Sequence, residues 1–146
     1  MSQPLSNSAR NQFKGTVSKL TKGMVNTEVI LDIGDGKTVT AVITNASVDY
    51  LGLQTGSVAH ALFKASWVIL NRESDFKTSA RNNFPGKVKS AKPGAVNAEI
   101  IVDISGDGKT ELVAIVTNES LERLGLKEGV EVNALIKSSH VIIGTK

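Results

Sequence analysis

The sequence predicts an all-β protein built from two tandem five-stranded barrels, each with one short helix. Three observations support this prediction. The chain of 146 residues contains nearly the same sequence pattern twice. Its composition is 40% apolar but only 4% aromatic. Within each copy, short β-rich runs alternate with turns that contain Gly and Asp, which is typical of small antiparallel barrels. One copy alone would be marginally stable, so we expect oligomers.

The internal repeat divides the chain. The pattern SARN-x-F-x-G-x-V occurs in "NSARNQFKGTV" (7–17) and again in "TSARNNFPGKV" (78–88). The other matching segments are "ITNASVDYLGLQTG" (43–56) with "VTNESLERLGLKEG" (116–129), and "ALFKASWVIL" (61–70) with "ALIKSSHVII" (134–143). About half of the aligned positions are identical. Since a fixed repeat marks a structural unit, we expect one domain over 5–70 and a second over 77–146.

The elements of one copy can be taken in order. "QFKGTVSKL" and "NTEVILDI" are β-rich, and the "GDGKT" that follows is typical of a tight hairpin turn before "VTAVIT". "TNASVDYLGL" is the one helical stretch, with Asn45 as the expected N-cap and Gly52 as the expected left-handed stop. We expect residues 58–70 to form one long strand with a bulge near Lys64. This order is that of a five-stranded Greek-key barrel of the OB type.

The composition excludes several function classes. Cysteine is absent, which removes disulfides and Cys-ligated metals, and the net charge is only +3. His60 matches Asn133 and His140 matches Trp67, so no histidine is repeated and no nucleophile–base pair is available to both copies. "GDGKT" lacks the glycine that a phosphate-binding loop needs five residues before its Gly-Lys pair. We therefore expect no enzyme and no direct metal ligands. Without an apolar run long enough to span a membrane, we expect a soluble, cytoplasmic protein.

The polar residues kept in both copies are rich in hydrogen-bond donors. Ser8, Arg10, Thr44, Ser47 and Lys64 offer two cations and three hydroxyls without a carboxylate in their immediate motifs. Such a group suits a small dianion, which needs charge-assisted hydrogen bonds. The start of the helix after Thr44 would add free backbone N–H groups. Each residue alone also has a structural interpretation, for example as a helix cap or a solvated strand residue.

The motifs "SARNQFKGTV", "ITNAS…LGL…G" and "ALFKASWVIL" resemble those of the molbindins, small cytoplasmic proteins that bind molybdate and tungstate. The resemblance covers nearly the whole chain. It implies OB-like barrels, a homotrimer, and oxyanion sites at interfaces between units, with molybdate or tungstate as ligand and no cofactor. The implied site residues are Ser8, Ala9 (through its backbone), Arg10, Thr44, Ser47 and Lys64 in the first copy, and Ser79, Ala80, Arg81, Thr117, Ser120 and Lys137 in the second. Ser66 and Ser139 are only candidates for a further type of site near the assembly axis.

Two other functions stay open at this point. OB-like barrels often bind single-stranded nucleic acid, but this needs aromatic side chains along a basic groove. Tyr50, Phe63 and Trp67 become Arg123, Ile136 and His140 in the second copy. A purely structural assembly module would bind no ligand. We expect cytoplasmic molybdate storage or homeostasis, with no nucleic acid and no membrane as partner.

Overall fold

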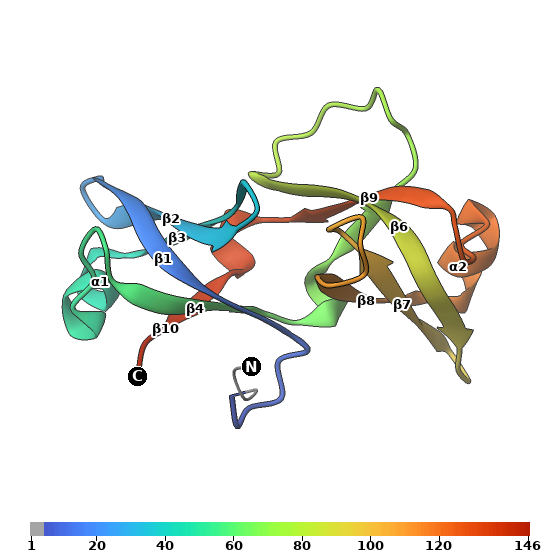
Figure 1. Cartoon of the computed structure of the whole chain (residues 1–146), viewed down its shortest axis with the longest axis horizontal. Coiled ribbons are helices and arrows are strands. Elements are labelled where there is room, and N and C mark those ends of the chain that lie inside the picture. The colour runs from blue at the N-terminus through green and yellow to red at the C-terminus, as the bar shows by residue number, and fades with distance from the viewer. Residues whose placement is uncertain (1–4) are drawn as a thin grey trace. The chain divides into compact units, whose positions relative to one another are not determined.

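The computed structural model describes residues 5–146, which form two five-stranded antiparallel sheets (Figure 1). In the order of hydrogen-bonded neighbours, the first sheet contains β10 (Ile142–Gly144), β4 (Val58–Phe63), β1 (Asn11–Lys22), β2 (Asn26–Gly34) and β3 (Lys37–Thr44). The second contains β5 (Ile69–Asn71), β9 (Glu131–Ile136), β6 (Asn82–Pro93), β7 (Asn97–Asp103) and β8 (Glu111–Thr117). Each sheet is accompanied by one short α-helix, so the predicted fold class is confirmed.

The compact units differ from the sequence repeats at one place. The first unit comprises the chain up to Phe63 together with Lys137–Lys146, and the second comprises Lys64–Ile136. Each repeat therefore supplies four strands to one unit and its last short strand to the other. The expected domains, 5–70 and 77–146, divide the chain by its repeat, whereas strand pairing divides it at the ends of β4 and β9.

The expectation of one long strand over 58–70 is wrong. β4 ends at Phe63, and Ala65–Trp67 form a single 3-10 turn, η1, before β5 begins. In this turn Val68 N–H donates to the carbonyl of Ala65 at 3.3 Å. The strand pairing explains the break: β4 pairs with β1, but Ile69 to Asn71 pair with Leu135 to Asn133 of β9. A chain that leaves one sheet for another cannot continue one ladder, so it turns between them.

The two helices, α1 (Asn45–Leu51) and α2 (Asn118–Leu124), begin and end in the same way. The predicted N-cap Asn45 is wrong by one residue, because the cap is Thr44, whose side chain accepts a hydrogen bond from Ser47 N–H. Asn45 instead ties the helix to the sheet by donating from Nδ2 to the Gly23 carbonyl at 3.0 Å. Gly52 adopts the predicted left-handed conformation, with φ of 64°.

The core of each unit is made mostly of aliphatic side chains, among which Val29 and Leu31 have no exposed surface, and Phe63 and Phe84 are buried with them. The first strand of each unit crosses closely over the second at a glycine. A Cβ on Gly15 would lie well inside van der Waals contact with the Asp32 carbonyl, and Gly86 meets Asp103 in the same way. The glycine of the repeated SARN-x-F-x-G motif is therefore required for packing.

Candidate functional site

The two S-A-R segments lie directly before β1 and β6 and are mostly exposed. They include the predicted backbone donors, and both of these already have acceptors. The N–H of Ala9 donates to Asn7 Oδ1 at 3.0 Å, and the N–H of Ala80 donates to Thr78 Oγ1 at 3.2 Å. An anion held by these amides would have to replace the Asn7 and Thr78 oxygens.

Strand pairing places the predicted arginine and lysine of one repeat at the same end of a strand pair. Asn11 pairs with Phe63, so Arg10 and Lys64 each stand one residue beyond that pair. Because Asn82 pairs with Ile136, Arg81 and Lys137 have the same relation in the second repeat. All four cations are exposed and can approach a ligand from solvent. Such a pair of cations attracts an anion.

The predicted hydroxyl donors form a second group at each helix start. Thr44 Oγ1 donates to Ser47 Oγ at 2.8 Å and accepts from Ser47 N–H at 3.1 Å. Thr117 and Ser120 repeat both contacts, at 3.0 and 3.1 Å. The threonine side chain thus accepts from one of the backbone N–H groups that were expected to bind an anion. The serine hydroxyl hydrogen is still available to another acceptor.

Within one repeat, the structure does not bring these two groups together. Thr44 pairs with Asn26, and the adjacent Thr27 pairs with Lys22 at the end of β1. Arg10 precedes the start of β1, a strand of 12 residues. At about 3.3 Å per residue, the two groups are separated by roughly 35 Å along the strand. Figure 1 shows α1 at the end of its unit away from the start of β1. No single small anion can contact both groups of one repeat.

The two hydroxyl residues of the second unit, Thr117 and Ser120, line a pocket of about 560 Å³. Residues of β5, β8 and α2 form its walls, and the pocket contains Thr117 and Ser120 together with Arg72 and Arg123. Arg72 Nη1 donates to the Leu124 carbonyl at the end of α2, at 2.7 Å. The sequence analysis missed both arginines because it kept only repeated residues, and they match Thr145 and Tyr50 in the other copy. Only the structure reveals them, because it places Arg72, the residue after β5, beside the end of α2.

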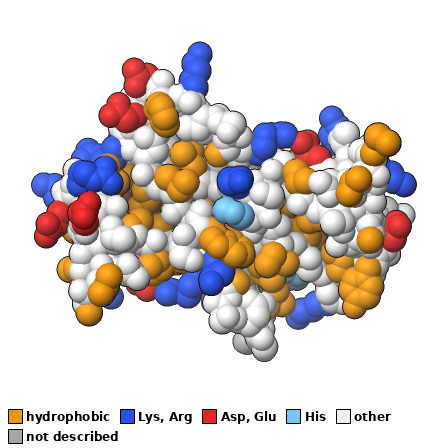
Figure 2. All heavy atoms as spheres, turned by 180° about the vertical axis from the view of Figure 1, so that it is seen from behind, with side chains coloured by type: hydrophobic (Ala, Val, Ile, Leu, Met, Phe, Trp, Pro, Cys, Tyr) orange, Lys and Arg blue, Asp and Glu red, His pale blue; other side chains and the backbone are white. Residues whose placement is uncertain are grey.

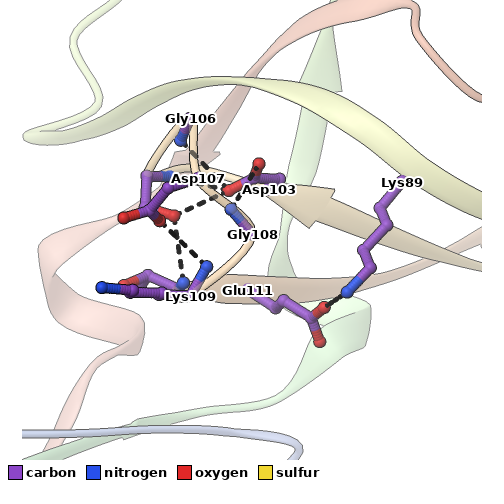
Figure 3. Close-up of polar contacts among 9 residues, drawn as sticks. Lys89, Asp103, Gly106, Asp107, Gly108, Lys109 and Glu111 are labelled. Carbon is purple, nitrogen blue, oxygen red and sulfur yellow. Dashed lines mark hydrogen bonds and ion pairs between the residues drawn. The ribbon is translucent and has the colours of Figure 1, made fainter.

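A second pocket, of about 500 Å³, is less suited to an anion. Its walls include the carboxylates of Asp103 and Glu131 beside Lys87. Asp103 organises the "GDGKT" loop of the second copy by accepting from the N–H groups of Ser105, Gly106 and Gly108. Figure 3 shows Asp103 with the last two of these residues. Hydrogen bonds, first of all from the Ser105 hydroxyl, lower the pKa of Asp103, so it is ionised at neutral pH. The loop binds its own carboxylate and would repel a phosphate.

The surface offers little for the other function classes. On the face seen in Figure 2, the Lys and Arg side chains are scattered among apolar ones rather than gathered in one stripe. Residues 5–146 contain no cluster of three or more His, Cys, Asp or Glu side chains that could hold a metal ion. In the same part of the chain, no helix is long and apolar enough to cross a membrane.

Comparisons with known proteins agree with the repeat and with the fold. The TOBE domain family model matches twice, over residues 7–70 and 78–143. A crystal structure of the cytoplasmic molybdate-binding protein ModG, with molybdate bound, superposes with a TM-score of 0.91 at 44% identity. That match covers 97% of this chain and 100% of ModG.

Longer relatives contain the same region. The molybdenum-pterin-binding protein MopA of Rhodobacter capsulatus is 44% identical over 93% of this chain and 51% of MopA. The molybdenum transport protein ModE of Azotobacter vinelandii is 40% identical over 97% of this chain and 52% of ModE. The chain thus spans about half the length of these curated relatives. Two tandem TOBE domains, aligned along all of ModG, show that this chain belongs to the TOBE domain family as a two-domain protein of the molbindin type.

Proposed function

We propose that this protein binds molybdate, and equally tungstate, reversibly and without catalysis, and that it serves molybdenum storage or homeostasis in the cytoplasm. One observation carries the proposal. The chain aligns at 44% identity along the full length of ModG, a protein whose crystal holds molybdate. The repeated donor residues give this likeness a chemical basis. The alternative of single-stranded nucleic-acid binding gains no support from relatives named for molybdate or molybdenum.

The donor chemistry favours a fully deprotonated oxyanion. Molybdate is a tetrahedral dianion near neutral pH, so each of its oxygens accepts hydrogen bonds. Arg10, Lys64 and the Ser47 hydroxyl can all donate to it. Hydrogen phosphate carries an O–H, and a site without carboxylates offers no charged acceptor for it, which costs binding energy relative to molybdate. Tungstate has nearly the same size and charge as molybdate, so it should bind as well.

We place the sites between neighbouring copies of the chain, assembled as a homotrimer. The Arg–Lys group and the Thr–Ser group lie at opposite ends of β1, so a complete site takes one group from each of two surfaces. Exposed apolar residues at matching positions of the two repeats support assembly: Val25 with Val96, and Ile69 with Ile142. Burying such side chains against a second copy is favourable. Ligand shared between chains would stabilise the assembly.

The test is calorimetric titration of the purified chain with molybdate, tungstate, sulfate and phosphate, combined with native mass spectrometry. We expect micromolar or tighter binding of the first two anions, weak binding of phosphate, and a trimer mass. Molybdate binding weaker than micromolar would refute the proposed ligand. A monomeric mass that persists with saturating molybdate would refute the proposed sites between chains.

A double variant tests the site residues. Arg10→Ala with Arg81→Ala removes one cation from each proposed site, and we expect loss of molybdate binding at both. The matched control is Lys19→Ala with Lys127→Ala, which removes the same charge from exposed positions outside the proposed sites. Equal loss in both variants would mean that general electrostatic attraction, and not a specific site, holds the anion.

A further inference from the structure

We propose that Trp67 is a positioning residue for Lys64, so that the sites built on Lys64 hold a tetrahedral dianion more tightly than those built on Lys137. This inference rests on the proposed function, in which both lysines are anion donors. The observation behind it is a cation–π contact: the Lys64 Nζ atom lies over the indole ring of Trp67, 5.8 Å from the ring centroid.

The backbone explains why these two side chains meet. Lys64 is the extended residue before η1, with φ of −74° and ψ of 143°, and Trp67 is the last residue of that turn. The N–H of Trp67 donates to the Lys64 carbonyl at 3.0 Å and closes the turn. Residues three apart on a 3-10 turn lie above one another. The turn therefore holds the indole beneath the lysine.

The contact suits anion binding because it restricts the lysine without consuming its hydrogen bonds. A free lysine populates many rotamers, and an anion must select one of them. An exposed cation–π contact favours one arrangement by about two- to five-fold. The ring faces only one side of the ammonium group, and the N–H bonds on the other side can still point to an oxyanion. Lys64 is exposed and so accessible to that ligand.

The second repeat supplies the internal comparison. Lys137 has nearly the same backbone, with φ of −66° and ψ of 137°, and it precedes the turn Ser138–His140. The N–H of His140 donates to the Lys137 carbonyl at 3.0 Å, as Trp67 does to Lys64. An imidazole replaces the indole, and indole is the aromatic ring that binds cations best. The two turns thus differ in the aromatic face while sharing the backbone.

The experiment is molybdate titration of the full chain and its variants by calorimetry. For the wild type we expect two classes of sites in equal number, separated by about two- to five-fold in affinity. Trp67→His, which copies the other repeat, should weaken the tighter class to match the other without changing the stoichiometry. His140→Trp should strengthen the weaker class, and this variant tests the inference without removing any native contact of Trp67. Lys64→Met should abolish the class that Trp67→His weakens.

The fluorescence of Trp67, the chain's single tryptophan, provides a second readout. In the wild type it should follow only the sites built on Lys64. In Trp67→His with His140→Trp it should follow only the sites built on Lys137. Unchanged affinities in both single variants, with wild-type binding intact, would overturn the inference alone. Absence of molybdate binding in the wild type would overturn the proposed function instead.

Discussion

The clearest stability prediction concerns a hydrogen bond that one repeat has and the other lacks. In the first unit, Thr27 Oγ1 donates to Asn45 Oδ1 at 2.6 Å. The corresponding residue in the second unit is Ala98, which has no exposed surface and no donor in its side chain. Within residues 5–146, the matching acceptor, Asn118 Oδ1, is buried without a hydrogen-bond partner. We therefore predict that Ala98→Thr stabilises the second unit.

The magnitude follows from the missing partner. A buried acceptor without a donor costs about 1–3 kcal/mol. The new hydroxyl must itself be desolvated, so we expect a net gain of about 1 kcal/mol over Ala98→Val, the control with the same shape and no donor. For a unit of this size, that difference corresponds to roughly 4–8 °C in Tm. Thr27→Val should destabilise the first unit by a similar amount, because it would leave Asn45 Oδ1 without a donor, as Asn118 Oδ1 is in the wild type.

The assay is urea unfolding followed by tryptophan fluorescence. Trp67 is the single tryptophan and lies in the second unit, so its signal reports on the unit that contains Ala98. The comparison between Thr and Val at position 98 removes the effect of the added volume, which both variants share. If Ala98→Thr is no more stable than Ala98→Val, the missing donor does not limit the stability of the second unit.

Three further predictions follow. Gly86→Ala should lower the free energy of unfolding in urea by about 1–3 kcal/mol, because the added Cβ would meet the Asp103 carbonyl. Gly144→Ala, with open space around it, should change little, and equal effects of the two variants would refute the packing role. Burial first, and then the charges of Lys14 and Lys146, lower the pKa of His60 below 6.5, so the free energy of unfolding should fall as the pH drops through 6.5. The fall should be smaller in His60→Asn, and parallel pH profiles of the two proteins would contradict this. Asp103→Ala removes the acceptor of the Gly106 and Gly108 N–H groups, so the hydrogen exchange of these two groups, measured by NMR, should become faster. Unchanged exchange rates would show that the Asp103 carboxylate does not hold the loop.

Several structural features could be read directly from the repeated sequence. The repeated motif marked the first strand of each unit, and the structure adds that this strand crosses closely over its neighbour at Gly15 and Gly86. Gly52 marked the end of a helix, because a left-handed residue without a Cβ is favoured there. The predicted N-cap was wrong because Thr44 and Asn45, two adjacent residues, can both cap a helix. Thr44 caps α1, and the Asn45 side chain instead donates to the Gly23 carbonyl.

By itself, the sequence determined the all-β class and the duplication, and it supplied the candidate donor residues for an anion, because repeated spacing and residue chemistry are local properties of the chain. Only the tertiary structure decided that the ends of the two repeats exchange places, since that depends on which sheet edge a short strand pairs with. It also placed Arg72 and Arg123 in one pocket with Thr117 and separated Arg10 from Thr44 by the length of β1. These are relations between distant segments, and no local pattern encodes them.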